Sequence, residues 1–156
     1  PIACKEGHDL VARENMLMAS CLAGMAFTNV SLGIVHSIAH TVGGMFGISH
    51  GLADAIILPY VIEYNMVDKS SYERYKKLAK SLGEESMLDA VKSLNKEIDI
   101  PKTLGEVIKD DKAFEANLEE IVKQSIADGC TKTNPIIPSE DDMKELLLYI
   151  YHGGAK

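Results

Sequence analysis

Hydrophobic residues recur along the chain with the spacing of α-helices, and their pattern changes partway along it. Up to about Asn65 the apolar residues form long segments that contain almost no charge. From Val67 onward they form stripes three and four positions apart, with charged residues between them. No alternation typical of a β-strand extends beyond a few residues. The sequence therefore predicts an all-α fold, a multi-helix bundle with short connections.

Three apolar helices are expected in the first half. Asp9 is well placed to cap the first helix, whose stretch Met16–Phe27 is apolar enough to be buried on nearly every side. A second helix carries histidines and is expected to end near Gly43. A third is expected to begin near His50, and Pro59 inside it should kink or end it, because proline removes a backbone donor.

The second half is expected to form amphipathic helices with clear boundaries. Ser70 and Glu73 have the spacing of a capping box, Gly83 suits the end of that helix, Pro101 stops the next, and Ser139 is expected to cap the last. The residues expected to face the core are Tyr72, Tyr75, Ala79, Leu82, Met87, Leu88, Val91, Leu94, Ile98, Phe114, Leu118, Ile121, Val122, Ile126, Met143, Leu146, Leu147 and Ile150.

Three of the five histidines lie in one uncharged segment, at His36, His40 and His50. No Asp, Glu, Lys or Arg occurs between Glu14 and Asp54. An uncharged stretch that carries three imidazoles is the strongest candidate for chemistry in this sequence.

The spacing of these histidines decides what they can bind together. On one continuous helix, His36 and His50 would be separated by about 21 Å, at about 1.5 Å per residue, which excludes a shared ion. Gly43, Gly44 and Gly47 lie between them, and glycine allows a chain to leave a helix and turn back. We therefore expect His36 and His50 to point into one cavity and His40 to face a neighbouring part of it, an arrangement that makes a shared metal ion possible.

Two other interpretations of the histidines stay open. The first is that they are core histidines hydrogen-bonded to the backbone. The second is a zinc clamp formed by His36 and His40, which lie one helical turn apart. Zinc proteases with that spacing carry a glutamate directly after the first histidine, whereas this chain has Ser37. Neutral imidazoles suit Fe²⁺ and Zn²⁺ equally, so the spacing does not identify the metal.

Composition narrows the class of protein. A net charge of −7 and the absence of a basic cluster argue against a nucleic-acid partner. The longest apolar stretch is 12 residues, and a membrane-spanning helix needs about 20, so no membrane association is expected. The start of the chain lacks the basic region of a signal peptide. Cys4, Cys21 and Cys130 lack metal-ligand spacing and suggest free thiols in a reducing cytoplasm.

A longer motif resembles a known family. Residues 33–53 fit the pattern G-x-x-H-x-x-x-H-x-x-G-G-x-x-x-I-x-H-G-x-A, which resembles the histidine signature of the iron-containing (group III) alcohol dehydrogenases. The similarity is strongest over residues 12–65 and thin over 83–125. It returns near the end in DGCTKTNP and SEDDMKELLLYIY.

The resemblance implies a fold, a reaction and roles for the histidines. The fold would be the C-terminal metal-binding domain that this family shares with the dehydroquinate synthases. His36 and His50 would be metal ligands, and His40 would lie beside the nicotinamide as a catalytic and cofactor-binding residue. The cofactors would be Fe²⁺, with Zn²⁺ as the alternative, and NAD or NADP. The reaction would be metal-assisted hydride transfer between a small alcohol and its aldehyde, in a homo-oligomeric enzyme.

Two features of the family have no counterpart in these residues. Its other metal ligands, an Asp and a third His one helical turn apart, lie farther upstream, and so does its nucleotide-binding α/β domain. We therefore expect residues 1–156 to be a single, partial helical domain, inactive when isolated from the N-terminal domain of the same enzyme. The alternatives are a zinc-dependent relative such as a glycerol dehydrogenase or dehydroquinate synthase, and a non-catalytic helical metal-binding or scaffold module.

Overall fold

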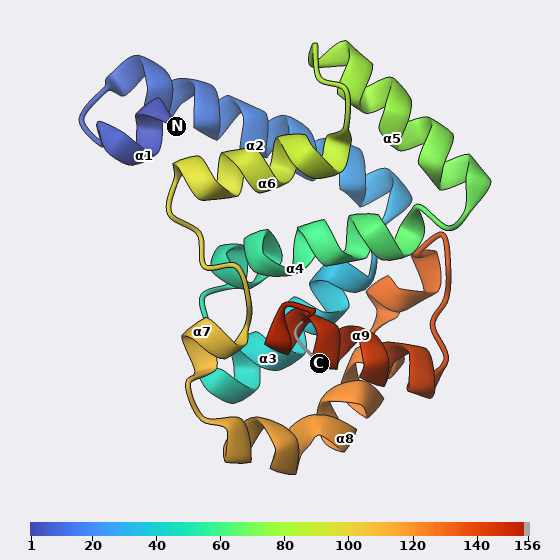
Figure 1. Cartoon of the computed structure of the whole chain (residues 1–156). Coiled ribbons are helices and arrows are strands. Elements are labelled where there is room, and N and C mark those ends of the chain that lie inside the picture. The colour runs from blue at the N-terminus through green and yellow to red at the C-terminus, as the bar shows by residue number, and fades with distance from the viewer. Residues whose placement is uncertain (155–156) are drawn as a thin grey trace.

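A computed structural model describes residues 1–154, and within that range the chain forms nine α-helices, one short 3₁₀ turn and no strand (Figure 1). The predicted all-α fold is confirmed. The elements are α1 (Ile2–Lys5), α2 (Leu10–Val30), α3 (Ile34–Phe46), α4 (His50–Asn65), α5 (Lys69–Ser81), α6 (Met87–Glu97), α7 (Gly105–Ile108), α8 (Asp111–Ala127), the 3₁₀ turn η1 (Gly129–Thr133) and α9 (Glu140–His152).

The core lies between α3, α4, α8 and α9. Helix α3 packs against α4 and α8. Helix α9 packs against the same two helices, α4 and α8. Complete burial of a large apolar side chain stabilises a fold by about 1.5–3 kcal/mol. The two segments that carry the histidines are therefore held by the best-packed part of the molecule. Its largest fully buried side chains are Phe114, Ile34, Ile38, Ile56, Ile57, Ile62, Leu104, Ile121, Met143, Leu147, Ile150 and Val42.

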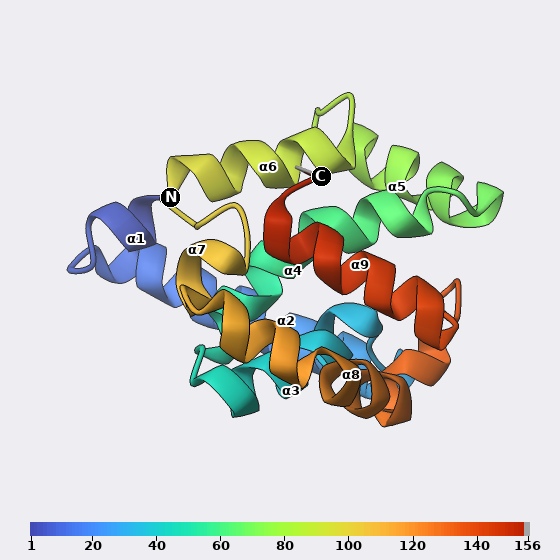
Figure 2. The same ribbon diagram turned by 60° about the horizontal axis from the view of Figure 1, so that its bottom comes forward.

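The outer helices are less well covered. In Figure 1 and Figure 2, α5 and α6 lie on the side of the molecule opposite α8. Helix α6 packs on α4, whereas α5, within the described part of the chain, makes extensive contacts with α6 alone. Three residues expected to face the core, Tyr72, Leu82 and Leu94, are therefore exposed. Apolar residues at helical spacing identify the apolar face of a helix, but they do not show whether another element covers that face.

Helix α2 departs most from expectation. The prediction that Met16–Phe27 is buried on nearly every side is wrong, because α2 contains no buried residue. Within residues 1–154, the extensive contacts of α2 are with α1 only. Apolar composition indicates that a helix requires a partner, and the described residues do not supply one. Its large exposed apolar side chains are Leu10, Val11, Met16, Leu17, Met18, Leu22, Met25, Phe27 and Val30.

Several helix boundaries were predicted correctly. The Asp9 side chain accepts a hydrogen bond from the Ala12 backbone N–H at the start of α2. Ser139 begins α9 with a complete capping box, in which Asp142 is the reciprocal partner. Helix α5, by contrast, is capped by Asp68, which accepts from the Ser71 N–H, so the predicted Ser70–Glu73 capping box is wrong. Asp68 and Ser70 are both residues that can cap a helix, and α5 begins after the earlier of the two.

Of the two effects expected of Pro59, a kink or an end of the helix, the end does not occur. The helix continues from His50 to Asn65 with Pro59 buried inside it. Pro59 has no N–H to donate to the carbonyl of Ala55, four residues earlier. The Asn95 side chain donates to that carbonyl instead, at 2.6 Å, from α6. A tertiary hydrogen bond thus replaces the one that proline removes.

No helix of the described residues is long and apolar enough to cross a membrane by itself, although α2 and α3 meet the length and composition test as a pair bent by 110°.

Candidate metal centre

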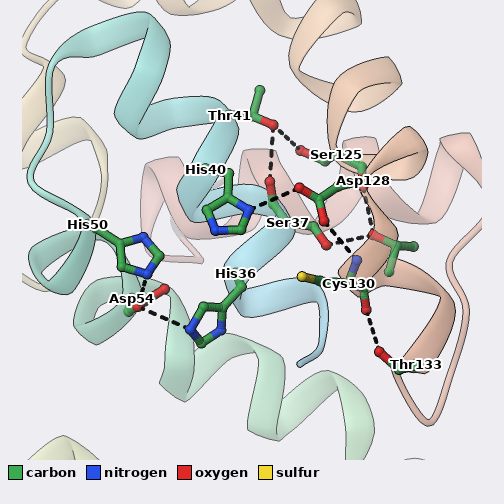
Figure 3. Close-up of polar contacts among 11 residues, drawn as sticks. His36, Ser37, His40, Thr41, His50, Asp54, Ser125, Asp128, Cys130 and Thr133 are labelled. Carbon is green, nitrogen blue, oxygen red and sulfur yellow. Dashed lines mark hydrogen bonds and ion pairs between the residues drawn. The ribbon is translucent and has the colours of Figure 1, made fainter. Parts of the chain in front are cut away.

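The three histidines meet where the first half of α3 faces the start of α4 (Figure 3). His36 and His40 project from the same face of α3, and His50 is the first residue of α4. The ring centroids of His36 and His50 lie 5.2 Å apart, those of His40 and His50 lie 5.3 Å apart, and those of His36 and His40 lie 6.0 Å apart. The structure therefore brings together the three imidazoles that the sequence singled out.

The turn between α3 and α4 produces this convergence. Helix α3 continues to Phe46, three residues beyond the expected end at Gly43. Gly47 adopts a left-handed conformation with φ 68°, and its N–H donates to the carbonyl of Gly43. Only glycine reaches such a φ readily, so the chain reverses at Gly47. A Cβ on Gly43 would lie 3.0 Å from the carbonyl oxygen of Ile48, which shows how closely the returning chain passes.

Asp54 joins the histidines, although the sequence analysis missed it. It lies one turn after His50 on α4, and its Oδ2 atom is 3.1 Å from His50 Nε2 and 3.6 Å from His36 Nε2. Its Oδ1 atom is buried and has no hydrogen-bond partner among the described residues. An unpaired buried carboxylate oxygen is costly unless a cation compensates it. The sequence did contain a signal, because Asp54 ends the uncharged segment at helical spacing from His50.

Electrostatics around His36 favour its neutral form. Burial lowers the pKa of His36, the Asp54 carboxylate partly opposes that effect, and the rings of His50 and His40 lower the pKa further. The neutral imidazole is the form that donates a lone pair to a metal ion. His36 is therefore held in its metal-binding form near neutral pH.

The donor set formed by these residues fits a divalent transition metal. His36, His50 and Asp54 each offer one donor atom, and these atoms all lie within 4.8 Å of one another. Two imidazole nitrogens with one carboxylate oxygen suit Fe²⁺ or Zn²⁺. We conclude that the residues present fit the metal that the sequence pattern implied.

His40 makes a separate contact. Its Nδ1 atom lies 2.9 Å from Asp128 Oδ2, and Asp128 Oδ1 accepts a hydrogen bond of 2.7 Å from the Cys130 backbone N–H. Burial alone raises the pKa of the Asp128 carboxyl, but the hydrogen bonds from His40 and Cys130 outweigh that effect and lower it. Asp128 is thus an ionised partner for His40, and the sequence analysis did not identify it because it lies 88 positions away.

A buried cluster of hydroxyl groups holds the Asp128 segment against α3. The Thr41 hydroxyl donates to the Ser37 carbonyl on α3, and the Ser125 hydroxyl of α8 donates to Thr41. The Thr131 hydroxyl lies 2.7 Å from the Ser37 hydroxyl and 2.6 Å from the Ser125 carbonyl oxygen. These contacts join α3, α8 and η1, so the position of Asp128 relative to His40 is fixed (Figure 3).

A small cavity opens beside the imidazoles. It has a volume of about 390 Å³ and is lined by Ala39, His40, Gly43, Gly44, Ile48 and His50. Gly44 has open space where a side chain would be, whereas Gly43 lies against the carbonyl of Ile48. This volume is at the lower end of the range for small-molecule sites.

Comparison with known proteins gives consistent matches along the chain. The profile of the Fe-containing alcohol dehydrogenase family, C-terminal, matches residues 1–151. The NADPH-dependent butanol dehydrogenase of Clostridium saccharobutylicum is 44% identical over 154 residues, which covers 93% of this chain and 39% of that protein. The NAD-dependent methanol dehydrogenase of Bacillus methanolicus is 33% identical over 159 residues, covering 94% of this chain and 40% of that protein.

A solved structure shares the fold. The alcohol dehydrogenase from Oenococcus oeni superimposes with a TM-score of 0.85 at 32% identity, over 96% of this chain and 40% of that one. The chain thus spans about two fifths of the length of the relatives that it matches.

Proposed function

Because the chain belongs to the iron-containing alcohol dehydrogenase family, we propose that it is the metal-binding part of an NAD(P)-dependent enzyme that interconverts short primary alcohols and aldehydes. The relatives named above are NAD- or NADPH-dependent dehydrogenases of butanol and methanol. The rest of the enzyme, outside these 156 residues, would bind the nucleotide. The proposal depends on one observation: His36 and His50 converge on a carboxylate whose buried second oxygen has no hydrogen-bond partner among residues 1–154.

His36 and His50 are the proposed ligands, and Asp54 supplies negative charge beside the ion. The bound ion, Fe²⁺ by family membership or Zn²⁺, would act as a Lewis acid toward the substrate oxygen. The turn at Gly47 holds the two imidazole nitrogens in place before the ion binds. Such preorganisation limits the entropy lost on binding.

His40 is the proposed acid–base residue and forms one edge of the site for the nicotinamide. It lies one turn from His36, faces the cavity, and contacts Asp128 through Nδ1. That contact orients the ring so that Nε2 is free to exchange the alcohol proton with solvent. General acid–base catalysis of this kind typically contributes about 10²–10⁴ in rate.

Histidine substitutions in the full-length enzyme test these assignments. We expect His36→Ala and His50→Ala to lose bound metal and activity together. His40→Ala should keep stoichiometric metal and lower kcat by about 10²–10⁴. His8→Ala, at an exposed histidine before α2, should change neither. Metal content is measured by elemental analysis, which also decides between iron and zinc.

The opposite pattern would identify the rival clamp. If His40→Ala emptied the metal site while His50→Ala left it filled, His36 and His40 would be the ligands and the present assignment would be wrong.

A further inference from the structure

We propose that His40, Asp128 and Cys130 form a second metal site, suited to a thiophilic divalent ion such as Zn²⁺ or Cd²⁺. His40 comes from α3, and the other two residues come from the segment at the start of η1. One donor atom from each lies within 4.8 Å of the others. This second site shares no residue with the His36–His50–Asp54 centre.

The chemistry of the three side chains determines which ion the second site takes. A thiolate, an imidazole and a carboxylate together favour Zn²⁺ and softer ions over Mg²⁺ and Ca²⁺, which prefer oxygen ligands. Three protein ligands leave one tetrahedral position for water. Each of the two sites has its own carboxylate, Asp54 in one and Asp128 in the other, so each ion has a local counter-charge.

The backbone already holds the second site in shape. Asp128 accepts a hydrogen bond from the N–H of Cys130, which keeps the carboxylate and the thiol side by side. The same carboxylate contacts His40 through its other oxygen. Figure 3 shows the Cys130 sulfur on the side of η1 that faces the imidazoles. The buried contact between Thr131 and Ser37 fixes η1 against α3, so binding an ion requires little rearrangement.

The second site is suited to reversible binding. Three protein ligands leave one coordination position of a tetrahedral ion open to solvent, where a chelator can reach it. The ion binds the thiolate form of Cys130, so the thiol proton passes to solvent as the metal–sulfur bond forms.

Occupation of the second site would inhibit the enzyme. This part rests on the proposed function, because it assumes that His40 exchanges the substrate proton. An ion that binds Nδ1 of His40, the nitrogen that faces Asp128, replaces the hydrogen bond to that carboxylate. The neutral ring then carries its proton on Nε2, which can no longer accept the proton of the alcohol. An excess of zinc would then slow an enzyme whose first site is already filled.

A cadmium titration of the full-length enzyme, with its first metal in place, tests the inference. We expect one additional equivalent of Cd²⁺ to bind, with a cadmium–thiolate charge-transfer absorption and a parallel loss of activity that a chelator reverses. Cys130→Ser should keep basal activity, lose the absorption, and raise the Cd²⁺ concentration for half-inhibition about tenfold or more. Cys4→Ser, at an exposed thiol on α1, is the matched control and should behave like the unmodified enzyme.

Three outcomes would overturn the inference. They are an absorption that persists in Cys130→Ser, a titration with no additional equivalent bound, and inhibition accompanied by release of the first metal. Cys130→Ala is a second variant in case the serine variant folds poorly, as judged by circular dichroism. Failure of the proposed function is distinguishable, because it would appear as metal retained in His36→Ala, while the cadmium–thiolate absorption would be unaffected.

Discussion

Asp54 is the residue that supplies charge to the candidate metal centre. It is the first acidic side chain after 39 uncharged positions, and its carboxylate lies between the two proposed ligands. Asp54→Asn preserves the shape of the side chain and removes the charge. We expect it to weaken metal binding about 10–100-fold, the usual cost of losing a residue that supports a metal site. Competition with a metal-sensitive dye measures the change in affinity.

The control for Asp54 is Asp99→Asn, at an exposed position where the backbone φ of 57° is one that asparagine tolerates. It should leave metal affinity unchanged. An Asp54→Asn enzyme that held its metal as tightly as the unmodified enzyme would show that the carboxylate is not needed.

Asp128 is expected to act on catalysis through His40. Asp128→Asn removes the charged acceptor that lies 2.9 Å from His40 Nδ1. We expect kcat to fall by roughly tenfold or more, and by less than in His40→Ala, while metal content stays stoichiometric. In a His40→Ala background the same change should have little further effect, because the group that Asp128 positions is then absent. Additive losses in the double variant would mean that Asp128 acts independently of His40.

These two acidic residues also show what the sequence could and could not predict about the site. His36, His40 and His50 were recognised because they lie in one short uncharged segment, and glycines indicated that the chain could turn back. Asp54 was present in the same pattern but was interpreted as its boundary. Asp128 gave no local signal, because only the packing of η1 on α3 brings it to His40.

At the scale of single elements, α4 tolerates Pro59 because α6 supplies a replacement hydrogen bond. Asn95→Ala would leave the carbonyl of Ala55 without its partner. We expect the free energy of unfolding of the chain to fall by about 0.5–1.5 kcal/mol, the typical net contribution of one hydrogen bond, because this bond is only partly buried. In a Pro59→Ala background the loss should be smaller, because the residue at position 59 then donates its own N–H to that carbonyl. Urea denaturation measures both values.

The matched control is Asn117→Ala on α8. Its side chain also donates to a backbone carbonyl, that of Ala113, but it does so on the exposed face of its own helix. Its removal should change stability by less than about 0.5 kcal/mol. Equal losses at positions 95 and 117 would show that the effect is unrelated to the proline.

Helix starts were easier to predict than helix environments. Asp9 and Ser139 cap their helices through contacts within three or four residues, so the sequence contains all the information needed. The end of α3 was placed too early, because glycine inside a helix is tolerated and only Gly47 adopts the left-handed conformation. The continuation of α4 through Pro59 depends on Asn95, 40 positions away from the carbonyl it satisfies, and no local pattern contains that information.

At the scale of the whole molecule, the apolar surface of α2 is the feature that the core does not explain. Leu17 is 74% exposed and Leu22 is 58% exposed, among nine large apolar side chains on this helix. Monomeric proteins rarely expose contiguous apolar patches beyond a few hundred Å². We propose that residues of the enzyme outside these 156 cover α2. When the chain is produced alone, the same surface should drive self-association, despite a net charge of −7 that opposes it.

Self-association through α2 is testable with the isolated 156-residue chain. We expect concentration-dependent oligomers by analytical ultracentrifugation and strong binding of a hydrophobic dye. Leu17→Gln combined with Leu22→Gln should shift the chain toward monomer and reduce dye binding without loss of helix content, because both side chains are exposed in the isolated chain. In the full-length enzyme the same pair should lower stability, because burying two amides without hydrogen-bond partners costs about 1–3 kcal/mol each.

The control for this last experiment is Val67→Gln. Val67 is 85% exposed but lies in the connection between α4 and α5, outside α2. It should alter neither the association of the isolated chain nor the stability of the full-length enzyme. A dilute chain that sedimented as a compact monomer and bound no dye would show that α2 needs no partner. The Leu17→Gln and Leu22→Gln pair is thus expected to improve the behaviour of the isolated chain and to lower the stability of the full-length enzyme. This combination would show that α2 is covered in the full-length enzyme, because an apolar helix that stays exposed would not lose stability.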